Sequence, residues 1–548
     1  MKHTIRKILM TILSVLCVCT MLFAVACGEE KKTNENSSEP TVSSSVEDSS
    51  EEQSSEEQSS EEQSSQEQSS QEQSSQEQSS SSGGGEEQQP VELPAAPNYS
   101  NDVNANVIIG AYDGGPAVEK VILTFPNSIP ASAVETRSLV VSWGGNMGNA
   151  STDKIYLCNK NGRKVNGLSS KNVAIEYAVS YSGYGFGNNL SPFSYANNYN
   201  SWKSINSVSL TMNNFNVEGN VYTRFTGTLN VTKSVPSLEK WDITGDHVKD
   251  GVHIKYGKFE PEVPAGEKRP LIIWLHGQGE GNTAGGNDPS IALLGNKVTP
   301  LAEDPIQSYF NGAFVLAPQA PTMWMDTITG TFPNSAYEYD TKSKYFDALE
   351  DLIRTYVAGN DKIDAKRVYV GGCSNGGWCT LELVSRMGNF FAACYPVCAP
   401  YAKAHFTDER FANLVSVPMW IIASNDDTTV NNNGDSNQSI NVDGIAHSKR
   451  LYIDLLEAGK TDLYFSLFAN VTADGISYMG HFSWIYVFRD EVKYVQTKPA
   501  NGAEFNKSQY NTGSRLTAKY NDNDVNMWQW LSTFKNDGTR VDPIFPQA

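Results

Sequence analysis

A short serine motif flanked by glycines is the clearest chemical signal in the chain. Gly372, Ser374 and Gly376 match the pattern G-x-S-x-G. An apolar run at 368–370 precedes the motif, and a helical pattern at 378–387 follows it. Glycines at these positions permit a tight turn that lifts the serine out of a sheet, and a helix start favours developing negative charge. The motif therefore predicts a nucleophilic serine at a strand-to-helix turn.

A serine nucleophile also needs a general base and an acid that orients the base, and candidates for both follow later in the chain. Two acids, Asp426 and Asp427, come directly after an apolar run at 420–423. A strand end is where this kind of fold would place the orienting carboxylate. The spacing alone leaves both acids open for the role.

Two of the seven histidines, His447 and His481, follow these acids. His447 opens an amphipathic segment, which is typical of a residue at a helix start. His481 follows Gly480 in a loop after the last predicted strand, at 463–468. We therefore interpret His481 as the base, and a structural histidine is the alternative.

Backbone amides near the motif are candidates to stabilise an oxyanion. The donors are expected to be the N–H of Asn375, directly after the serine, and one N–H from the first strand-to-helix loop. That loop is 276–279, after an apolar run at 270–275, and Gln278 is the predicted second donor. An ordinary glycine-rich turn is the alternative interpretation of this loop.

Three tryptophans, Trp324, Trp378 and Trp484, are candidates to line the site. Aromatic rings stack on sugars or aryl acyl groups, but packing in the core is the alternative. We expect no cofactor. We also expect no metal site, because no two histidines have ligand spacing and the Asp/Asn-rich loop lacks an EF-hand pattern.

These residues require elements that bring strand ends together. From about residue 237 onward, apolar strand-like runs alternate with helical patterns, and the apolar residues between 341 and 358 fall on one helical face. This alternation predicts a mostly parallel sheet covered on both faces, over residues 237–548. Residues 94–236 instead carry six or seven short β-rich runs separated by Gly, Asn, Pro and Ser, which predicts a small all-β sandwich.

The N-terminal residues 1–26 have the parts of an export signal. Lys2, Arg6 and Lys7 precede an apolar run from 8 to 26. Cys27 then follows small residues, which resembles a bacterial lipobox, where the cysteine becomes the lipidated first residue of the mature protein. The resemblance implies a membrane anchor at Cys27 on the extracellular face of the cell membrane. An uncleaved anchor and a plain signal peptide are the alternatives.

Residues 27–93 form a predicted disordered tether. Within 29–93 there are 18 acidic residues and two lysines, so this segment carries −16 of the total charge of −20. Its repeats EEQSS and QEQSS hold almost nothing apolar to bury. Because the rest of the chain has moderate charge, a strongly basic nucleic-acid-binding face is not expected. A polytopic membrane protein is excluded, since only one apolar run is long enough to matter.

The segment from about 240 to 535 resembles the α/β-hydrolase superfamily, and within it secreted esterases related to the prolyl oligopeptidase and feruloyl esterase groups. The matching pieces are WLHGQGEG, LAPQAP, GGCSNGGW, IIASNDDTTV and GHFSW. The resemblance favours Asp427 over Asp426, because Asp427 and Val430 fit the D-x-x-V spacing of related hydrolases. The β region resembles the immunoglobulin-like N-terminal domain that some of these esterases carry.

Together these features predict a serine esterase that acts through Ser374, His481 and Asp427. The expected substrates are acyl esters on plant polysaccharides or their fragments, and the acyl group stays open. The alternatives are a peptidase of the prolyl oligopeptidase type and a non-catalytic surface binding protein. Five cysteines follow the tether: Cys158, Cys373, Cys379, Cys394 and Cys398. A bond from Cys373 or Cys379 to Cys394 or Cys398 and buried free thiols both stay open.

Overall fold

The computed structural model describes residues 103–546, with gaps at 132–133, 135–138, 144–150, 182–189, 197, 206–207, 218–219, 282–287, 327–342, 431–446, 498–513 and 515. All described residues belong to one compact unit. The export signal, Cys27 and the tether lie outside the described residues. Within the described part, no helix is both long enough and apolar enough to cross a membrane.

The first part of the described chain is built from strands. A five-stranded sheet has the order β10-β1-β2-β5-β4, a three-stranded sheet has the order β3-β8-β9, and β6 and β7 form a hairpin. The strands are β1 (Asn104–Tyr112), β2 (Gly115–Pro130), β3 (Leu139–Trp143), β4 (Thr152–Cys158), β5 (Ser169–Tyr177), β6 (Phe193–Ala196), β7 (Tyr199–Trp202), β8 (Val208–Val217), β9 (Asn220–Thr228) and β10 (Asn230–Ser234). Alternate residues of β1, including Val107 and Ile109, are fully buried, as the period of two in a half-buried strand requires.

The second part holds an eight-stranded sheet with the order β11-β12-β14-β13-β15-β16-β17-β18. Its strands are β11 (Asp242–Lys249), β12 (Val252–Phe259), β13 (Arg269–Leu275), β14 (Phe314–Gln319), β15 (Ile363–Cys373), β16 (Ala393–Val397), β17 (Met419–Ser424) and β18 (Leu463–Phe468). The six strands from β14 to β18 along this order are mutually parallel, whereas β12 pairs antiparallel with both β11 and β14. The predicted mostly parallel sheet is therefore confirmed.

Successive residues of the central strand β13 enter two different cores. Leu271 and Ile273 pack with the helices of one face, and Ile272 and Trp274 pack on the other. Because both faces are covered, the strand is buried along its whole length and shows a continuous apolar run. This explains why its sequence lacks the alternation of a half-exposed strand.

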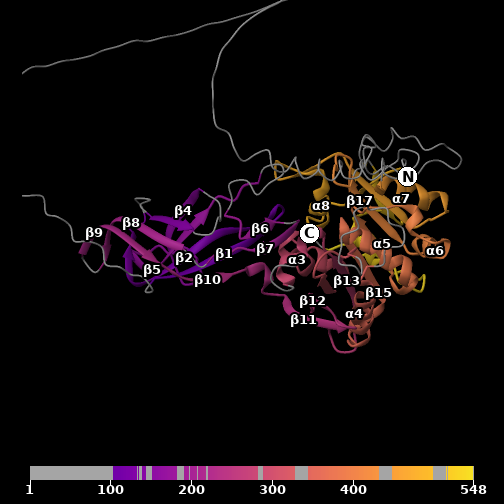
Figure 1. The fold of residues 1–548 in the computed structure, drawn as a ribbon, viewed down its shortest axis with the longest axis horizontal. Coiled ribbons are helices and arrows are strands. Elements are labelled where there is room, and N and C mark those ends of the chain that lie inside the picture. The colour runs from indigo at the N-terminus through magenta and orange to yellow at the C-terminus, as the bar shows by residue number, and fades with distance from the viewer. Residues whose placement is uncertain are drawn as a thin grey trace, which may run out of the picture. The chain divides into compact units, whose positions relative to one another are not determined.

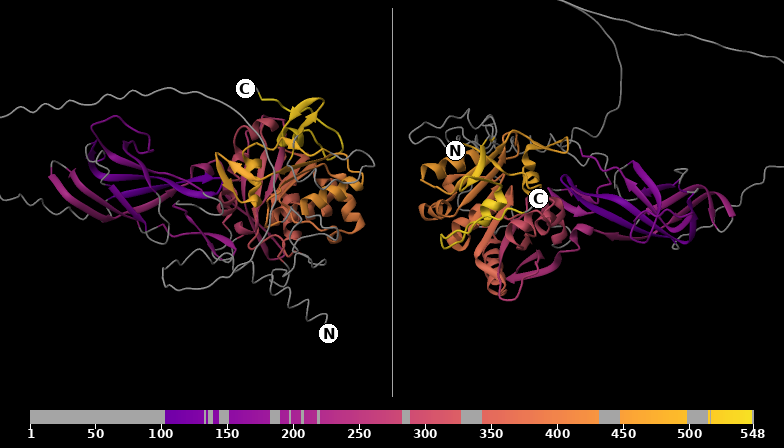
Figure 2. Two further views of the ribbon diagram at one scale, coloured as in Figure 1. Left: turned by 90° about the horizontal axis from the view of Figure 1, so that it is seen from above. Right: turned by 180° about the vertical axis from the view of Figure 1, so that it is seen from behind.

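Helices cover both faces of this sheet (Figure 1). They are α3 (Pro289–Gly295), α4 (Phe346–Ala358), α5 (Asn375–Met387), α6 (Asp408–Ser416), α7 (His447–Glu457), α8 (Trp484–Phe488) and α9 (Met527–Ser532). The helices α4 to α7 contribute to the first core, and their orange ribbons group on one side of the sheet in Figure 2. The helices α8 and α9 contribute to the second core.

Short elements follow the main sheet strands. The pair β19 (Val471–Ala473) and β20 (Ile476–Tyr478) precedes a 3-10 turn, η7 (Gly480–Phe482). A small sheet joins β21 (Tyr494–Val495), β22 (Leu516–Tyr520) and β23 (Asn523–Val525). Another 3-10 turn, η2 (Gln278–Glu280), directly follows β13.

Two glycines let β13 and the start of α5 come into backbone contact. A Cβ atom at Gly376 would lie 2.1 Å from the Leu275 carbonyl oxygen, and one at Gly372 would lie 2.5 Å from the same oxygen. Real Cβ atoms essentially never approach other atoms so closely. The glycines of the serine motif are therefore required by the packing of β13 against the turn as well as by the turn itself.

Candidate active site

Ser374 stands between β15 and α5 in a backbone conformation that side-chain-bearing residues rarely adopt. Its φ is 54° and its ψ is −118°. Such a conformation costs on the order of 1–3 kcal/mol and persists only where surrounding contacts hold it. Here the Ser374 N–H donates to the Val397 carbonyl (2.9 Å), and its carbonyl accepts from the Trp378 N–H (2.9 Å). The half-buried serine hydroxyl is therefore presented at the carboxyl edge of the parallel strands.

Asp427 leaves the end of β17 and is completely buried. Its Oδ1 accepts hydrogen bonds from the N–H groups of Thr429 (2.9 Å) and Val430 (2.8 Å). Its Oδ2 lies 2.9 Å from Nδ1 of His481. The two backbone bonds fix the carboxylate so that its second oxygen faces the imidazole.

The neighbouring Asp426 takes a different place. Its Oδ1 accepts a hydrogen bond from the Ser424 hydroxyl, and the same oxygen lies against Gly480. A Cβ atom at Gly480 would lie 2.2 Å from it. The geometry thus pairs Asp427 with the imidazole and uses Asp426 to pack the two loops together.

His481 belongs to η7 and is almost fully buried. Burial alone would lower the pKa of its imidazole, but the charge of Asp427, contact with Cys398 and hydrogen bonds to both raise that pKa well above its ordinary value. Among the contacts of the described residues, no hydrogen bond joins Ser374 Oγ to His481. Catalytic hydrogen bonds are often long in a structure without substrate and shorten in the complex. The missing hydrogen bond is therefore consistent with Ser374 and His481 acting together.

The other candidate base, His447, is the first residue of α7, as its sequence position suggested. Its Nδ1 accepts a hydrogen bond from the Tyr401 N–H (3.1 Å). Burial lowers the pKa of His447 to about 4, so the ring is neutral at physiological pH. His447 is therefore a buried helix-start residue with its own backbone partner.

The two predicted amide donors both begin a helix. Asn375 is the first residue of α5, and Gln278 is the first residue of η2. A backbone N–H at such a position has no acceptor inside its own helix and is available to another group. The loops also touch, since a Cβ atom at Gly277 would lie 3.4 Å from Sγ of Cys373, next to the serine. This arrangement is compatible with an oxyanion site at the start of α5.

A buried carboxylate in the same loop was not recognised from the sequence. Glu280 lies in η2, and burial raises its pKa to about 7, although hydrogen bonds from Asn296, Asn200 and nearby backbone act against that rise. Asn200 comes from β7, and its Nδ2 lies 3.3 Å from Glu280 Oε1. The hairpin of the N-terminal β region is thus bonded to the loop that carries Gln278.

Further contacts hold this hairpin in place. The Trp202 Nε1–H donates to the Ser290 hydroxyl (3.1 Å) at the start of α3, and Phe193 packs in a small core with Ile291 and Leu294. The one sequence signal that could have drawn attention to Glu280 is its place in the polar Gln-Gly-Glu stretch directly after a buried strand. Nothing in the sequence connects it with Asn200, which lies 80 positions earlier.

The three tryptophans have different surroundings. Trp324 is fully buried in the first core, where its ring centroid lies 5.0 Å from that of His276. A side chain without exposed surface does not meet a ligand from solvent, so Trp324 corresponds to the core-packing alternative that the sequence left open. Trp378 and Trp484 are also buried, but the Trp484 ring lies 5.7 Å from the His481 ring, edge to face. Trp484 therefore lies beside the site.

The five cysteines after the tether are all buried free thiols. None of the disulfides that the sequence left open is formed. Cys398 follows β16 and lies beside His481, which the spacing of residues in the sequence did not indicate.

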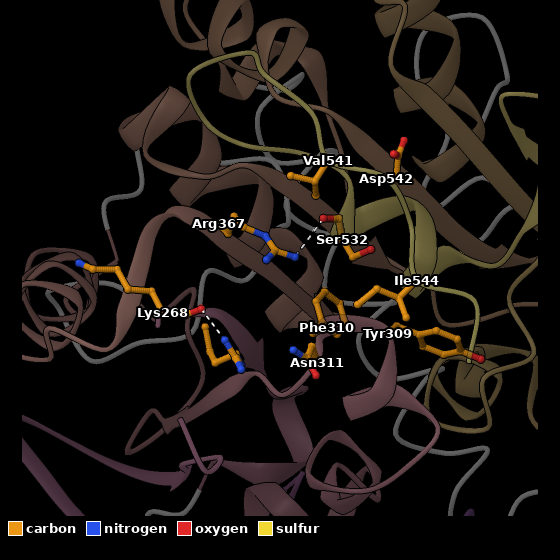
Figure 3. Close-up of a pocket in the computed structure, with 10 residues that line it drawn as sticks. Lys268, Tyr309, Phe310, Asn311, Arg367, Ser532, Val541, Asp542 and Ile544 are labelled. Atoms are coloured by element: carbon orange, nitrogen blue, oxygen red, sulfur yellow. Dashed lines mark hydrogen bonds between the residues drawn. The ribbon is translucent and has the colours of Figure 1, made fainter. Parts of the chain in front are cut away.

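A separate cavity of about 260 Å³ lies away from these residues (Figure 3). Lys268, Arg269 and Arg367 line it together with Tyr309, Phe310, Asn311, Ser532, Val541, Asp542 and Ile544. The Arg367 guanidinium donates to the Ser532 carbonyl (3.2 Å), as Figure 3 shows. Because β13 begins at Arg269, whereas the serine turn follows the end of β15, this cavity is distinct from the candidate active site.

No protein-family model and no curated protein matches the chain. Among solved structures, a thermostable esterase aligns with a TM-score of 0.56 and 21% identity over 70% of this chain and 96% of that one. A ferulic acid esterase aligns with a TM-score of 0.30 and 16% identity over 45% of this chain and 93% of that one. An acylaminoacyl peptidase of Pyrococcus horikoshii aligns with a TM-score of 0.31 and 12% identity over 57% of this chain and 49% of that one.

The likeness to the thermostable esterase concerns the fold. Together with the antiparallel second strand and the parallel strands that follow it, this likeness shows that residues 242–534 adopt the α/β-hydrolase fold. The expected fold of this part of the chain is confirmed. At this level of identity the comparison says nothing about the reaction.

The pairing of His481 with Asp427 leads to a first prediction. In Asp427→Asn the negative charge next to Nδ1 disappears, so the pKa of His481 should fall by about one unit or more. The matched change Asp426→Asn should leave that pKa nearly unchanged. Nuclear magnetic resonance titration of the histidine ring measures both values, and an equal fall in the two variants would contradict the assignment.

The contact between Asn200 and Glu280 leads to a second prediction. In Asn200→Asp the new carboxylate lies about as close to Glu280 as the Asn200 amide does now. Two negative charges at that distance repel each other, so ionisation of both groups is disfavoured. The folded pKa of the pair then exceeds the unfolded value, so the variant should lose stability relative to the parent progressively as pH rises from about 4, the unfolded value, through about 7. One unit of added shift corresponds to about 1.4 kcal/mol.

Thermal unfolding of both proteins between pH 5 and pH 8 measures this loss. The control is Asn200→Ala, which removes the hydrogen bond without adding charge and should destabilise by an amount that depends less on pH. Parallel stability curves for Asn200→Asp and the parent protein would contradict the contact.

Proposed function

We propose that this protein is a serine esterase that cleaves carboxylic esters through an acyl-enzyme. The observation that carries the proposal is the buried Asp427–His481 hydrogen bond at the same sheet edge as the strained turn of Ser374. A hydroxyl, a carboxylate and an imidazole in that order along the chain are what this reaction needs on this fold.

Each residue has a defined role in the proposed reaction. Ser374 Oγ attacks the ester carbonyl carbon while its proton passes to His481, and the carbonyl π electrons move to oxygen. Asp427 keeps the imidazole in the tautomer with Nδ1–H and stabilises the imidazolium that forms. The N–H groups of Gln278 and Asn375 donate to the oxyanion.

Collapse of the tetrahedral intermediate expels the alcohol, which takes its proton from His481. Water then attacks the acyl-enzyme, again with His481 as base, and releases the carboxylic acid. Because the base must be neutral, activity should rise with pH through the pKa of His481. Asp427 raises that pKa, so the rise should be centred above the ordinary value for histidine.

The substrate class follows from the sequence resemblance to feruloyl esterases. We propose acyl groups of the acetyl or feruloyl type on plant polysaccharides or oligosaccharides as substrates. The Trp484 ring beside His481 is suited to contact with a sugar or an aryl acyl group.

The proposed enzyme is held at the cell surface. We assign residues 1–26 to a lipoprotein signal, 27–93 to a tether that starts at lipidated Cys27, 94–236 to an immunoglobulin-like sandwich and 237–548 to the catalytic domain. A flexible tether of this length would span roughly 45 Å, and its repelling charges would extend it further.

The nucleophile assignment is tested with Ser374→Ala. Removal of the hydroxyl should lower kcat on a p-nitrophenyl ester by about three orders of magnitude or more, since no acyl-enzyme can form. The parent protein should be labelled by a fluorophosphonate at Ser374, as mass spectrometry would show. Substantial turnover by the folded variant would refute the mechanism, and an unlabelled, inactive parent would favour a binding protein.

The substrate class requires a panel assayed with the same two proteins. Aryl esters, acetylated xylan, feruloylated oligosaccharides and prolyl amides distinguish the esterase from a peptidase of the prolyl oligopeptidase type. Faster cleavage of the amides than of all the esters would overturn the esterase assignment.

The anchor is tested with Cys27→Ser. Without the thiol no lipid can be attached, so the variant should leave the membrane fraction while keeping its activity per molecule. An unchanged partition between membrane and soluble fractions would show that something other than a lipid at Cys27 holds the protein.

A further inference from the structure

Three side chains with metal-binding atoms converge from three separate loops. Cys398 follows β16, Asp427 follows β17 and His481 lies in η7. One ligand atom from each of these residues lies within 4.8 Å of the other two. All three residues are buried, with at most 7% of their surface exposed.

The backbone holds Cys398 in this position. Its N–H donates to the Ile422 carbonyl of β17 (2.8 Å), and its φ of 39° lies in the left-handed region. The preceding Val397 carbonyl accepts from the Ser374 N–H (2.9 Å), so the turn at Cys398 is directly connected to the serine turn. The Cys398 sulfur lies within 4.8 Å of a ring nitrogen of His481.

This set of donors matches one class of ligand. A thiolate, an imidazole nitrogen and a carboxylate oxygen are the usual ligands of Zn²⁺, at bond lengths near 2.0–2.3 Å. Tetrahedral geometry with such bonds separates ligand atoms by about 3.5 Å. The Asp427 and His481 atoms, now 2.9 Å apart, would need to separate by about half an ångström, and the Cys398 sulfur would need to approach by at most little more than about 1 Å.

We propose that Cys398, Asp427 and His481 form a Zn²⁺-binding site that switches the active site off reversibly. Solvent occupies the fourth position on the ion. The thiol proton leaves to solvent as the zinc–sulfur bond forms, and the imidazole binds as the neutral ring through a lone pair.

The inhibition follows from the part that His481 plays, and so rests on the proposed function. Nδ1 is the ring nitrogen that can share an ion with Asp427, because it is the one 2.9 Å from the carboxylate. When Nδ1 binds the ion, the ring loses the bond to Asp427 that orients it. The neutral ring then carries its proton on Nε2 and cannot accept the Ser374 proton, so the general base is removed while the fold stays intact.

The binding experiment is independent of activity. Co²⁺ is added to the full-length Ser374→Ala protein, where a thiolate ligand gives a near-ultraviolet charge-transfer band and tetrahedral Co²⁺ gives visible bands. We expect both at one ion per chain, and addition of Zn²⁺ should remove them. Cys398→Ser in the same background should lose the charge-transfer band.

The matched control is Cys394→Ser, four positions earlier and inside β16. Cys394 is also a buried free thiol, but it belongs to the opposite core. This variant should keep the full spectrum. Absence of the bands in Ser374→Ala, or their persistence in Cys398→Ser, would overturn the site.

Activity of the protein with its serine intact then tests inhibition. Zn²⁺ should abolish ester hydrolysis, EDTA should restore it, and the concentration for half inhibition should rise at least tenfold in Cys398→Ser but stay the same in Cys394→Ser. Equal inhibition of both variants would overturn the proposal. A protein that binds Co²⁺ but cleaves no ester would refute the proposed esterase and leave the metal site standing.

Discussion

The candidate active site depends on the close contact between the end of β13 and the turn that follows β15. That contact exists only because Gly372 and Gly376 have no side chains where the Leu275 carbonyl approaches. Because the two backbones are in contact, the loop after β13 and the start of α5 lie next to each other at the edge of the sheet. The strained conformation of Ser374 is held there by hydrogen bonds to Val397 and Trp378, and the packed sheet supplies the free energy that the strain costs.

Burial of carboxyl groups is the second constraint, and hydrogen bonds from amide groups of the loops compensate for its cost. Asp427 has no exposed surface, and two N–H groups together with the imidazole of His481 satisfy its oxygens. Glu280 is held in a similar way by amide donors, one of which comes from Asn200 in the N-terminal hairpin. A buried carboxylate has lost its hydration, and only its hydrogen-bond donors compensate for that loss. Because the donors come from different loops, each carboxylate holds those loops together.

The same loops explain why a thiol stands next to the imidazole. Parallel strands β15, β16 and β17 end at one edge, so the residues that follow them, Ser374, Cys398 and Asp427, are brought into one neighbourhood. The sheet topology thus brings a hydroxyl, a thiol and a carboxylate to the same sheet edge. The proposed catalysis and the proposed metal inhibition both depend on this arrangement.

Local patterns in the chain were sufficient to predict the α/β-hydrolase fold, and they also gave Ser374, Asp427 and His481 as candidate residues. Apolar runs mark buried strands, glycines mark the serine turn, and an acid after a strand marks the sheet edge, because each of these signals depends on neighbours a few residues away. The spacing itself left Asp426 and Asp427 as equal candidates for the orienting acid. It also gave no reason to prefer Trp484 over Trp324 as a residue that lines the site. Their true surroundings depend on which loop or core packs against them.

Contacts between distant segments arose from the folded chain alone. Asn200 meets Glu280 and Cys398 meets His481 because strands far apart in the sequence end side by side. No periodicity or motif in the sequence indicates such a long-range contact. The free energy that stabilises the contact comes from burial of side chains over the whole sheet. The sequence therefore showed which residue types could do chemistry, whereas the packing decided which of them are neighbours, including the three residues of the proposed metal site.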